Sequence, residues 1–169
     1  GTSGGSSDLD TRQTTFSNSY AAGSVERLAL DVLNAERGFC GFGVLQPNAK
    51  LDTASKNHAT YLVTNNKTGH DETAGLAGFT GIDAAAQTKA AGYTFKSALV
   101  AQVVTSTGVA FSTEQGVAAV RSLLSAPYHL TGMMSGAREV GLGRAAMADR
   151  LAFNLFLASA STLQAAPSN

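Results

Sequence analysis

Three histidines are the side chains of this sequence best suited to chemistry: His58, His70 and His129. Imidazole serves as a metal ligand and as a general base. If His70 and His129 converge in the fold, they offer two nitrogen ligands to zinc, which takes three or four protein ligands, or two or three with solvent. A third ligand could come from Glu72, Asp71 or His58, although nothing in the spacing requires it. The histidines predict a zinc site only if the fold gathers them.

Other catalytic signatures are missing or weak. The sequence contains no GxSxG, Walker or HExxH motif, which removes the best-known hydrolase and nucleotide-binding signatures. The stretch "GLGRAA" from Gly141 fits a dinucleotide pattern formally, but no helical period follows it, so a strand with close backbone approach is the better interpretation. Cys40 is the only cysteine, so an internal disulfide is excluded. The flanking Phe39 and Phe42 predict a buried or loop-packed thiol rather than a catalytic one.

Hydrophobic periodicity indicates the elements that must position the histidines. From Ser24, a suitable N-cap, "VERLALDVLNAER" places apolar residues on one helical face, and the glycines of "GFCGFG" end that helix. "KLDTASKNHATYLVTNN" repeats the pattern, with His58 on the apolar stripe between Leu51 and Tyr61, which predicts a buried, hydrogen-bonded histidine. "KTGHDETAGLAGFTG" has no periodicity and predicts a loop that carries His70.

The next segments predict two helices and an extended stretch between them. "IDAAAQTKAAGY" is a short helix closed by Gly92, and "TFKSALVAQVVTST" is extended through Val104. A capping box at Ser112 and Gln115 opens the next helix, which Pro127 ends. Its apolar stripe includes Val117, Val120 and Leu124.

The last segments predict a hairpin. "REVGLGRAAM" and "RLAFNLFLAS" are expected to be strands joined by a tight turn at Ala148 and Asp149. The nearly continuous apolarity of the second strand predicts a central position, covered on both faces. The fold class is therefore α+β, with helices packed on both sides of an antiparallel sheet.

Composition predicts one exported domain without a nucleic-acid partner. Of the 169 residues, 12 are basic and 12 acidic, and they form no basic stripe for nucleic acid or anionic membranes. The charged fraction of 14% and the abundance of small polar residues are typical of exported bacterial proteins. No run reaches the ~20 apolar residues of a membrane helix.

We expect a flexible segment over 1–23, a domain over 24–160 and a tail over 161–169. The first segment suggests a removed signal or an upstream lipid anchor, an ordinary disordered terminus being the alternative.

Several stretches together resemble the CAP superfamily, the SCP-like domain of cysteine-rich secretory proteins, insect venom antigens, plant pathogenesis-related proteins and many bacterial exported proteins. They are "LNAERGFCGFGVLQPNAKLDTASKNHATYL", "TGH", "AAGY", "SAPYH" and "EVGLG", in the family's order. The bacterial branch is most similar, because the paired cysteines of eukaryotic members are missing. The resemblance implies a three-layer α-β-α sandwich with a surface cleft, into which two histidines and two glutamates project in many members. It implies that His70 and His129 face each other across this cleft, with His58 in a structural position.

The acidic residues are where this sequence departs from the family. Gln102 in "LVAQVV" stands where the resemblance implies the first glutamate, and it cannot carry a negative charge. The second glutamate has no counterpart in "RSLLS", before "PYH". A pair of imidazoles without carboxylates attracts a divalent cation less strongly and lacks an obvious general base.

Two functions are therefore expected from different classes. The first is a non-enzymatic, extracytoplasmic binding module that is secreted, periplasmic or lipid-anchored, with Gln102, Tyr128 and Glu72 in the cleft and zinc held weakly, if at all, by His70 and His129. The ligand would be a small lipid-like or cell-envelope molecule, as the resemblance implies, bound by a monomer. Its apolar lip would comprise Leu130, Met133 and Met134, whose alternative role is core packing. The second is a zinc-dependent hydrolase of peptides or wall polymers, with Glu72 as its base.

Overall fold

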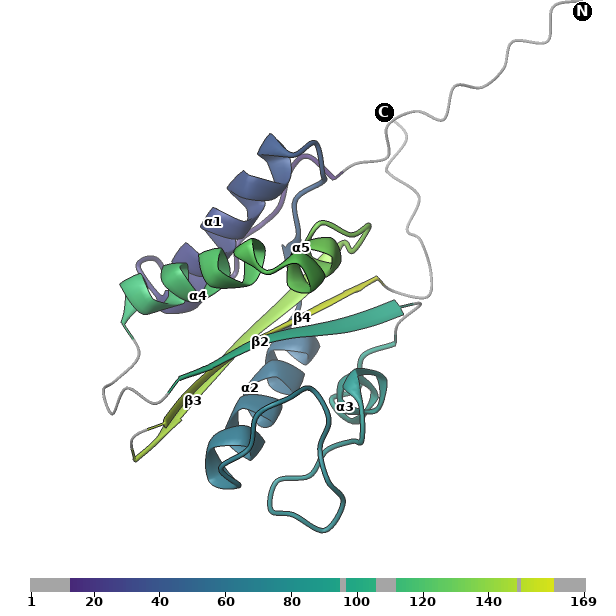
Figure 1. Ribbon diagram of the computed structural model, residues 1–169. Helices are drawn as coiled ribbons and strands as arrows, with labels where there is room; N and C mark the ends of the chain where they lie inside the picture. The colour runs from purple at the N-terminus through teal and green to yellow at the C-terminus, as the bar shows by residue number, and fades with distance from the viewer. Residues whose placement is uncertain (1–12, 95–96, 106–111, 149, 160–169) are drawn as a thin grey trace, which may run out of the picture.

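The computed structural model describes residues 13–94, 97–105, 112–148 and 150–159, and within 97–105 it describes the backbone alone. These residues form five helices and four strands (Figure 1). In chain order the elements are α1 (Val25–Phe39), β1 (Gln46–Pro47), α2 (Ala49–Thr64), α3 (Ala84–Ala90), β2 (Ser97–Thr105), α4 (Thr113–Ser125), α5 (Pro127–Met133), β3 (Glu139–Met147) and β4 (Arg150–Ser159).

The described strands form one mixed sheet with the order β1-β3-β4-β2. β4 pairs antiparallel with β3 and β2, whereas β1 pairs parallel with β3. The expectation of an antiparallel sheet is corrected by β1, whose two residues include a proline and carry no strand pattern in the sequence. The predicted hairpin is confirmed, with Ala148 in its turn at a φ of 51°. β4 is buried along all but its two end residues, as its apolarity predicts.

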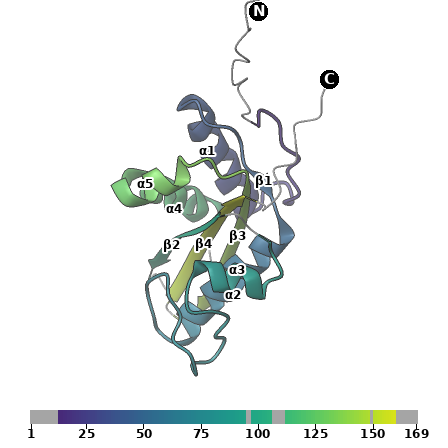
Figure 2. The ribbon, with the colours of Figure 1, turned by 90° about the vertical axis from the view of Figure 1, so that its right-hand side faces the viewer.

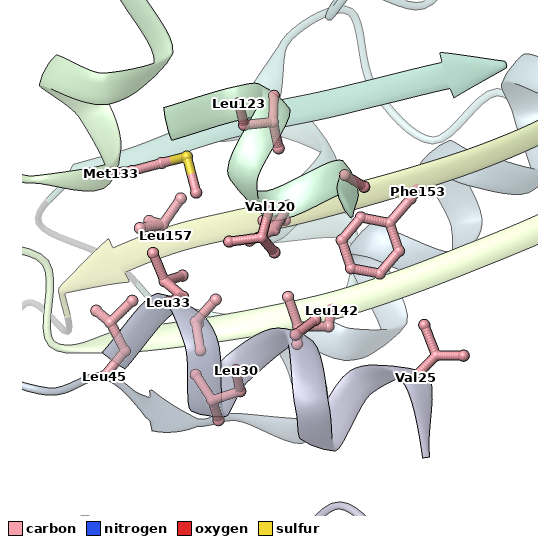
Figure 3. Packing of buried hydrophobic residues seen from close by; sticks show 14 residues of the cluster. Val25, Leu30, Leu33, Leu45, Val120, Leu123, Met133, Leu142, Phe153 and Leu157 are labelled. Carbon is pink, nitrogen blue, oxygen red and sulfur yellow. The ribbon is translucent and has the colours of Figure 1, made fainter. Parts of the chain in front are cut away.

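Helices cover both faces of the sheet (Figures 1 and 2). On one face, apolar side chains of α1, α4 and α5 pack against alternate residues of β3 and β4 (Figure 3). This core includes Leu30, Val120, Met133, Leu142 and Phe153. On the other face, α2 packs against the intervening residues of the same strands, and Tyr93 after α3 joins this second core. The α+β class follows from this arrangement.

The caps of α1 and α4 agree with the sequence, whereas the buried face of α4 does not. Ser24 Oγ accepts a hydrogen bond from the N–H of Arg27, and Ser112 and Gln115 form the predicted capping box. The buried residues of α4 are Gly116, Ala119, Val120 and Leu123. The predicted stripe is shifted because Gly116 lies against α1, where an added Cβ would be 2.5 Å from Val25 Cγ1. The missing side chain lets the two helices approach closely.

Pro127 begins a helix that the sequence analysis did not predict. α4 ends at Ser125, and Pro127 then occupies the first turn of α5. Proline suits this position because its fixed φ is helical. Its lack of an N–H costs nothing there, since N–H groups in the first turn have no acceptor within the helix. His129 therefore lies on a short helix.

The region around Cys40 also differs from the prediction. Cys40 is exposed, and Phe39 is 91% exposed. The expected buried or loop-packed thiol is wrong, because α1 continues to Phe39 and ends away from the sheet, while Gly41 turns the chain at a φ of 82°. Only Phe42 keeps a packing role, with its ring centroid 5.7 Å from the guanidinium carbon of Arg37.

Residues 13–23, predicted to be flexible, pack against the domain. The N–H of Val44 donates to Gln13 O, and the amide side chain of Gln46 bonds the backbone of Ser17. The hydroxyl of Tyr20 donates to Asp52 on α2 over 2.5 Å. The segment therefore runs beside β1 toward the start of α1. Residues 1–12 of the predicted segment 1–23, and the predicted tail 161–169, lie outside the described residues.

Candidate functional site

The fold brings His70 and His129 together. Their ring centroids lie 5.9 Å apart with an interplanar angle of 81°. His70 comes from the loop between α2 and α3, and His129 from the first turn of α5. These segments belong to opposite faces of the sheet, so their side chains can meet only around its β2 edge. Figure 2 shows α5 and the loop on the β2 side of the sheet.

The separation of the two rings suits a shared ion. An ion bound to both rings at about 2.0–2.1 Å from each nitrogen keeps the centroids within roughly 6.5 Å of each other. The observed 5.9 Å satisfies this limit. However, no three His, Cys, Asp or Glu side chains in the described part of the chain form a group able to hold a metal. The described residues therefore offer two imidazole nitrogens at this place.

Electrostatics favours the neutral form of His70. Partial desolvation lowers its pKa, and the neighbouring imidazoles of His129 and His58 lower it further, while Asp71 opposes them. Two nearby imidazoles resist double protonation because like charges repel. A neutral imidazole is the form that binds metal or accepts a hydrogen bond. At neutral pH, His70 is therefore ready for either role.

Buried side chains fix the backbone on both sides of His70. His58 Nε2 lies 3.2 Å from the carbonyl oxygen of Gly69, and Gln87 Nε2 donates to the carbonyl of His70 over 3.0 Å. His58 and Gln87 are 0% and 1% exposed. The predicted core position of His58 is confirmed. The role of Gln87 in holding the His70 loop was not predicted. The available signal was a glutamine on the buried side of a short helix.

Glu72 lies in a different setting from the predicted cleft. It is 3% exposed, and its Oε1 lies 3.0 Å from His58 Nδ1. Its Oε2 accepts the backbone N–H groups of Thr80 and Gly81 over 2.5 and 3.2 Å. Because these donors occupy both carboxylate oxygens, Glu72 closes the loop from inside and is not placed to act as a metal ligand or as the base of a hydrolase.

One proton is shared within the pair of His58 and Glu72. The carbonyl of Gly69 cannot donate, so His58 Nε2 must carry a hydrogen to bond it. The short contact between His58 Nδ1 and Glu72 then requires a single proton between nitrogen and oxygen. Either assignment of that proton leaves the pair with no net charge. This lowers the free-energy cost of burying it completely.

Arg37 holds the far end of the helix that carries His129. Its guanidinium donates to the carbonyl of Met133, the last residue of α5, to the carbonyls of Ser135 and Ala137 after it, and to that of Gly43. The last carbonyls of a helix have no partner within it, so the bond to Met133 satisfies one of them. Burial lowers the pKa of Arg37 to about 10, so the side chain remains charged at neutral pH. This contact ties α5 to α1.

The remaining predicted cleft residues divide between surface and core. Tyr128 is 94% exposed and Leu130 is 40% exposed, both beside His129 on α5. Met133 is fully buried in the first core, which corrects its placement on the lip, and Met134 is half-buried. The backbone of Gln102 lies on β2 opposite Asn154, and its side chain lies outside the described residues.

Two exposed apolar residues of the His70 loop were missed by the sequence analysis. Phe79 is 39% exposed and Ile82 is 65% exposed. No periodic pattern marks Phe79, because the loop follows neither a helical nor a strand repeat. Ile82 was expected in the short helix that follows, but α3 begins only at Ala84. Exposed apolar side chains therefore occur on both segments that contribute a histidine.

Comparison with known proteins identifies the fold. No protein-family model and no curated protein matches the sequence. Among solved structures, an extracellular SCP-domain protein from Bacillus anthracis aligns with a TM-score of 0.58 at 14% identity, covering 85% of this chain. The chain spans 45% of that protein's length. An outer surface protein from Borrelia burgdorferi aligns with a TM-score of 0.62 at 14% identity, covering 84% of this chain and 97% of its own.

At such low identity the likeness concerns the fold.

In the described part of the chain, no helix has both the length and the apolarity that a membrane crossing requires. The structural neighbours lead to one assignment: this chain has a CAP-like fold, shared with a bacterial SCP-domain protein.

Proposed function

We propose that this chain is an extracytoplasmic, non-enzymatic binding module, a three-layer α-β-α sandwich that takes a small apolar or amphipathic ligand between α5 and the His70 loop. The observation that carries the proposal is the contact of His70 with His129 between two segments that both expose apolar side chains. Large exposed apolar residues gathered around polar groups are typical of ligand sites. A fatty-acid-like molecule fits, because its tail can cover Leu130 and Ile82 while its head group bonds the imidazoles.

The ligand proposal predicts saturable binding of a fluorescent fatty acid, dansyl-undecanoic acid, whose emission rises in an apolar site. Ile82→Ser and Leu130→Ser are each expected to weaken binding by about three- to tenfold, because each removes part of an apolar contact surface. Phe39→Ser removes an exposed apolar residue at the C-terminal end of α1 and serves as the matched control, with no change expected. Equal affinities in all three variants, or no saturation, would contradict the proposal.

We further propose that zinc binds weakly to the histidine pair. Two imidazole ligands predict a dissociation constant above about 1 µM by calorimetry at neutral pH. His70→Ala and His129→Ala should each abolish the signal in a folded protein. Binding should also disappear as the pH falls through the pKa of His70, because protonation removes the ligand lone pair.

A zinc-dependent hydrolase of peptides or wall polymers is the alternative, and the ring separation supports it. Tighter zinc binding that both alanine variants abolish would favour this alternative over a weak site. The position of Glu72 speaks against it, since a hydrolase needs a base beside the bound water.

We infer that the protein works as a monomer outside the cytoplasm, being secreted, periplasmic or lipid-anchored at the cell envelope. Two observations support this location. The structural neighbours are described as an extracellular and an outer surface protein. The low charged fraction of the sequence is typical of exported proteins.

A further inference from the structure

The outer edge of β3 is only partly paired. β1 pairs with β3 at Glu139 and Val140, and no described strand continues the pairing beyond Val140. The N–H of Asn48 donates to Val140 O, and the N–H of Leu142 donates to Asp52 Oδ1 over 2.9 Å. Even-numbered residues of β3 therefore direct their backbone groups away from β4.

The next even-numbered residues are Arg144 and Ala146. Both are exposed, and their register with β4 places their N–H and C=O groups on the same outer edge as those of Leu142. Among the described residues, no donor or acceptor pairs with these backbone groups. An open edge of this kind is a template for another strand.

A cleft of about 480 Å³ borders this edge. It lies between Glu26 of α1, residues Asp52, Thr53 and Lys56 of α2, and residues 142–146 of β3. Its volume falls within the range of ligand sites. Because β3 and β2 lie on opposite sides of β4, the cleft is separate from the histidine pair.

Two cations and two carboxylates line the cleft, and their charges balance, but within the described residues only Lys56 among them has no bonded partner. Arg144 Nε lies 2.7 Å from Glu26 Oε1, and Asp52 accepts bonds from Tyr20 and Leu142. Lys56 is exposed, and its ammonium group has no partner in the described part of the chain. An acidic side chain on an incoming segment would complement it.

Two other occupants fit this edge less well. Residues 13–20 of the chain itself line the edge as far as Asp52, and the chain then enters α1 before reaching Arg144. A second copy that paired residues 142–146 antiparallel about their centre would place Arg144 opposite its own copy, and directly opposed like charges are destabilising.

We propose that residues 142–146 of β3 accept an extended acidic peptide segment of another protein as an added strand, with Lys56 binding its carboxylate. This interaction surface goes beyond the proposed lipid-like ligand and is independent of it. Main-chain hydrogen bonds supply the affinity in such strand addition, and side chains supply the selectivity.

The test uses a fluorescein-labelled, acetylated peptide, Thr-Val-Thr-Glu-Thr-Val-Thr, and the full chain. Binding should saturate below roughly 1 mM peptide and slow the amide exchange of Arg144 and Ala146. Ala146→Pro removes the outward N–H and should weaken binding by about three- to tenfold, the factor for one lost hydrogen bond. Ala146→Ser keeps that N–H and should bind like the parent. Lys56→Glu should weaken binding, whereas Lys50→Glu, on the exposed start of α2, should not.

Three results would overturn the proposal. The first is slow exchange of the Arg144 and Ala146 amides in the free chain, which would mean that this edge is already covered. The second is protection that grows with protein concentration, which would identify a second copy as the occupant. The third is peptide binding that is absent, or equal in Ala146→Pro and Ala146→Ser. None of these results bears on fatty-acid binding at the histidine pair.

Discussion

Replacing Glu72 with alanine is expected to lower the free energy of unfolding by about 3–5 kcal/mol, the range for breaking a buried charged pair. The change leaves His58 Nδ1 without its partner, and the N–H groups of Thr80 and Gly81 without their acceptor, inside the protein. Each buried donor without a partner costs about 1–3 kcal/mol. Urea unfolding followed by circular dichroism measures the loss.

The neighbouring Asp71→Ala variant is the matched control, because Asp71 is exposed and its loss should change stability by no more than about 0.5 kcal/mol. Glu72→Gln keeps one acceptor oxygen and should fall between the two, which preserves the test if the alanine variant does not fold. The histidine NMR signals of His70 should broaden in the glutamine variant, since its loop loses support. Equal stability of Glu72→Ala and Asp71→Ala would show that the buried network does not hold the loop.

Gly143→Ala is expected to destabilise the protein by about 3 kcal/mol, at the upper end of the range for overpacked positions. An added Cβ would lie 2.1 Å from the backbone nitrogen of Lys56 and 2.3 Å from the carbonyl carbon of Ser55. These atoms belong to the helix backbone, so no side-chain rotation relieves the clash, and α2 must move away from the sheet.

Gly136→Ala provides the control for this substitution. No atom lies within 4 Å of a Cβ added there, so its stability should stay level or rise by about 0.4–1 kcal/mol through the unfolded state. Thermal and urea unfolding of both variants decide the comparison. Similar stabilities for Gly143→Ala and Gly136→Ala would mean that α2 is not packed this closely on β3.

Much of the fold could be predicted because local patterns and tertiary packing agree. The stripe of α2 placed His58 in the core, and the continuous apolarity of "LAFNLFLAS" placed β4 at the centre of the sheet. β1 could not be predicted, because two residues are too few to show an alternating pattern. α5 was missed because Pro127 was interpreted only as the end of the preceding helix. Pro127 also has two opposite meanings, as the end of one helix and the start of another.

The candidate site was harder to predict than the fold. Sequence spacing placed Glu72 two residues from His70, but the loop turns its carboxylate inward to Thr80 and Gly81. Loop geometry of this kind depends on hydrogen bonds between residues that have no fixed spacing. Phe39 and Phe42 resemble packing residues in the sequence, yet only the direction of α1 decides that Phe39 is exposed.

The meeting of His70 and His129 around the β2 edge has a consequence for cooperativity. The hydrophobic cores above and below the sheet are separate clusters of side chains, and different parts of a protein can open locally with different free energies. A molecule held by both imidazoles would connect those clusters through a contact that bypasses the strands. Occupancy at one small site would then raise the free energy of opening on both sides of the sheet, by an amount set by ligand concentration and affinity.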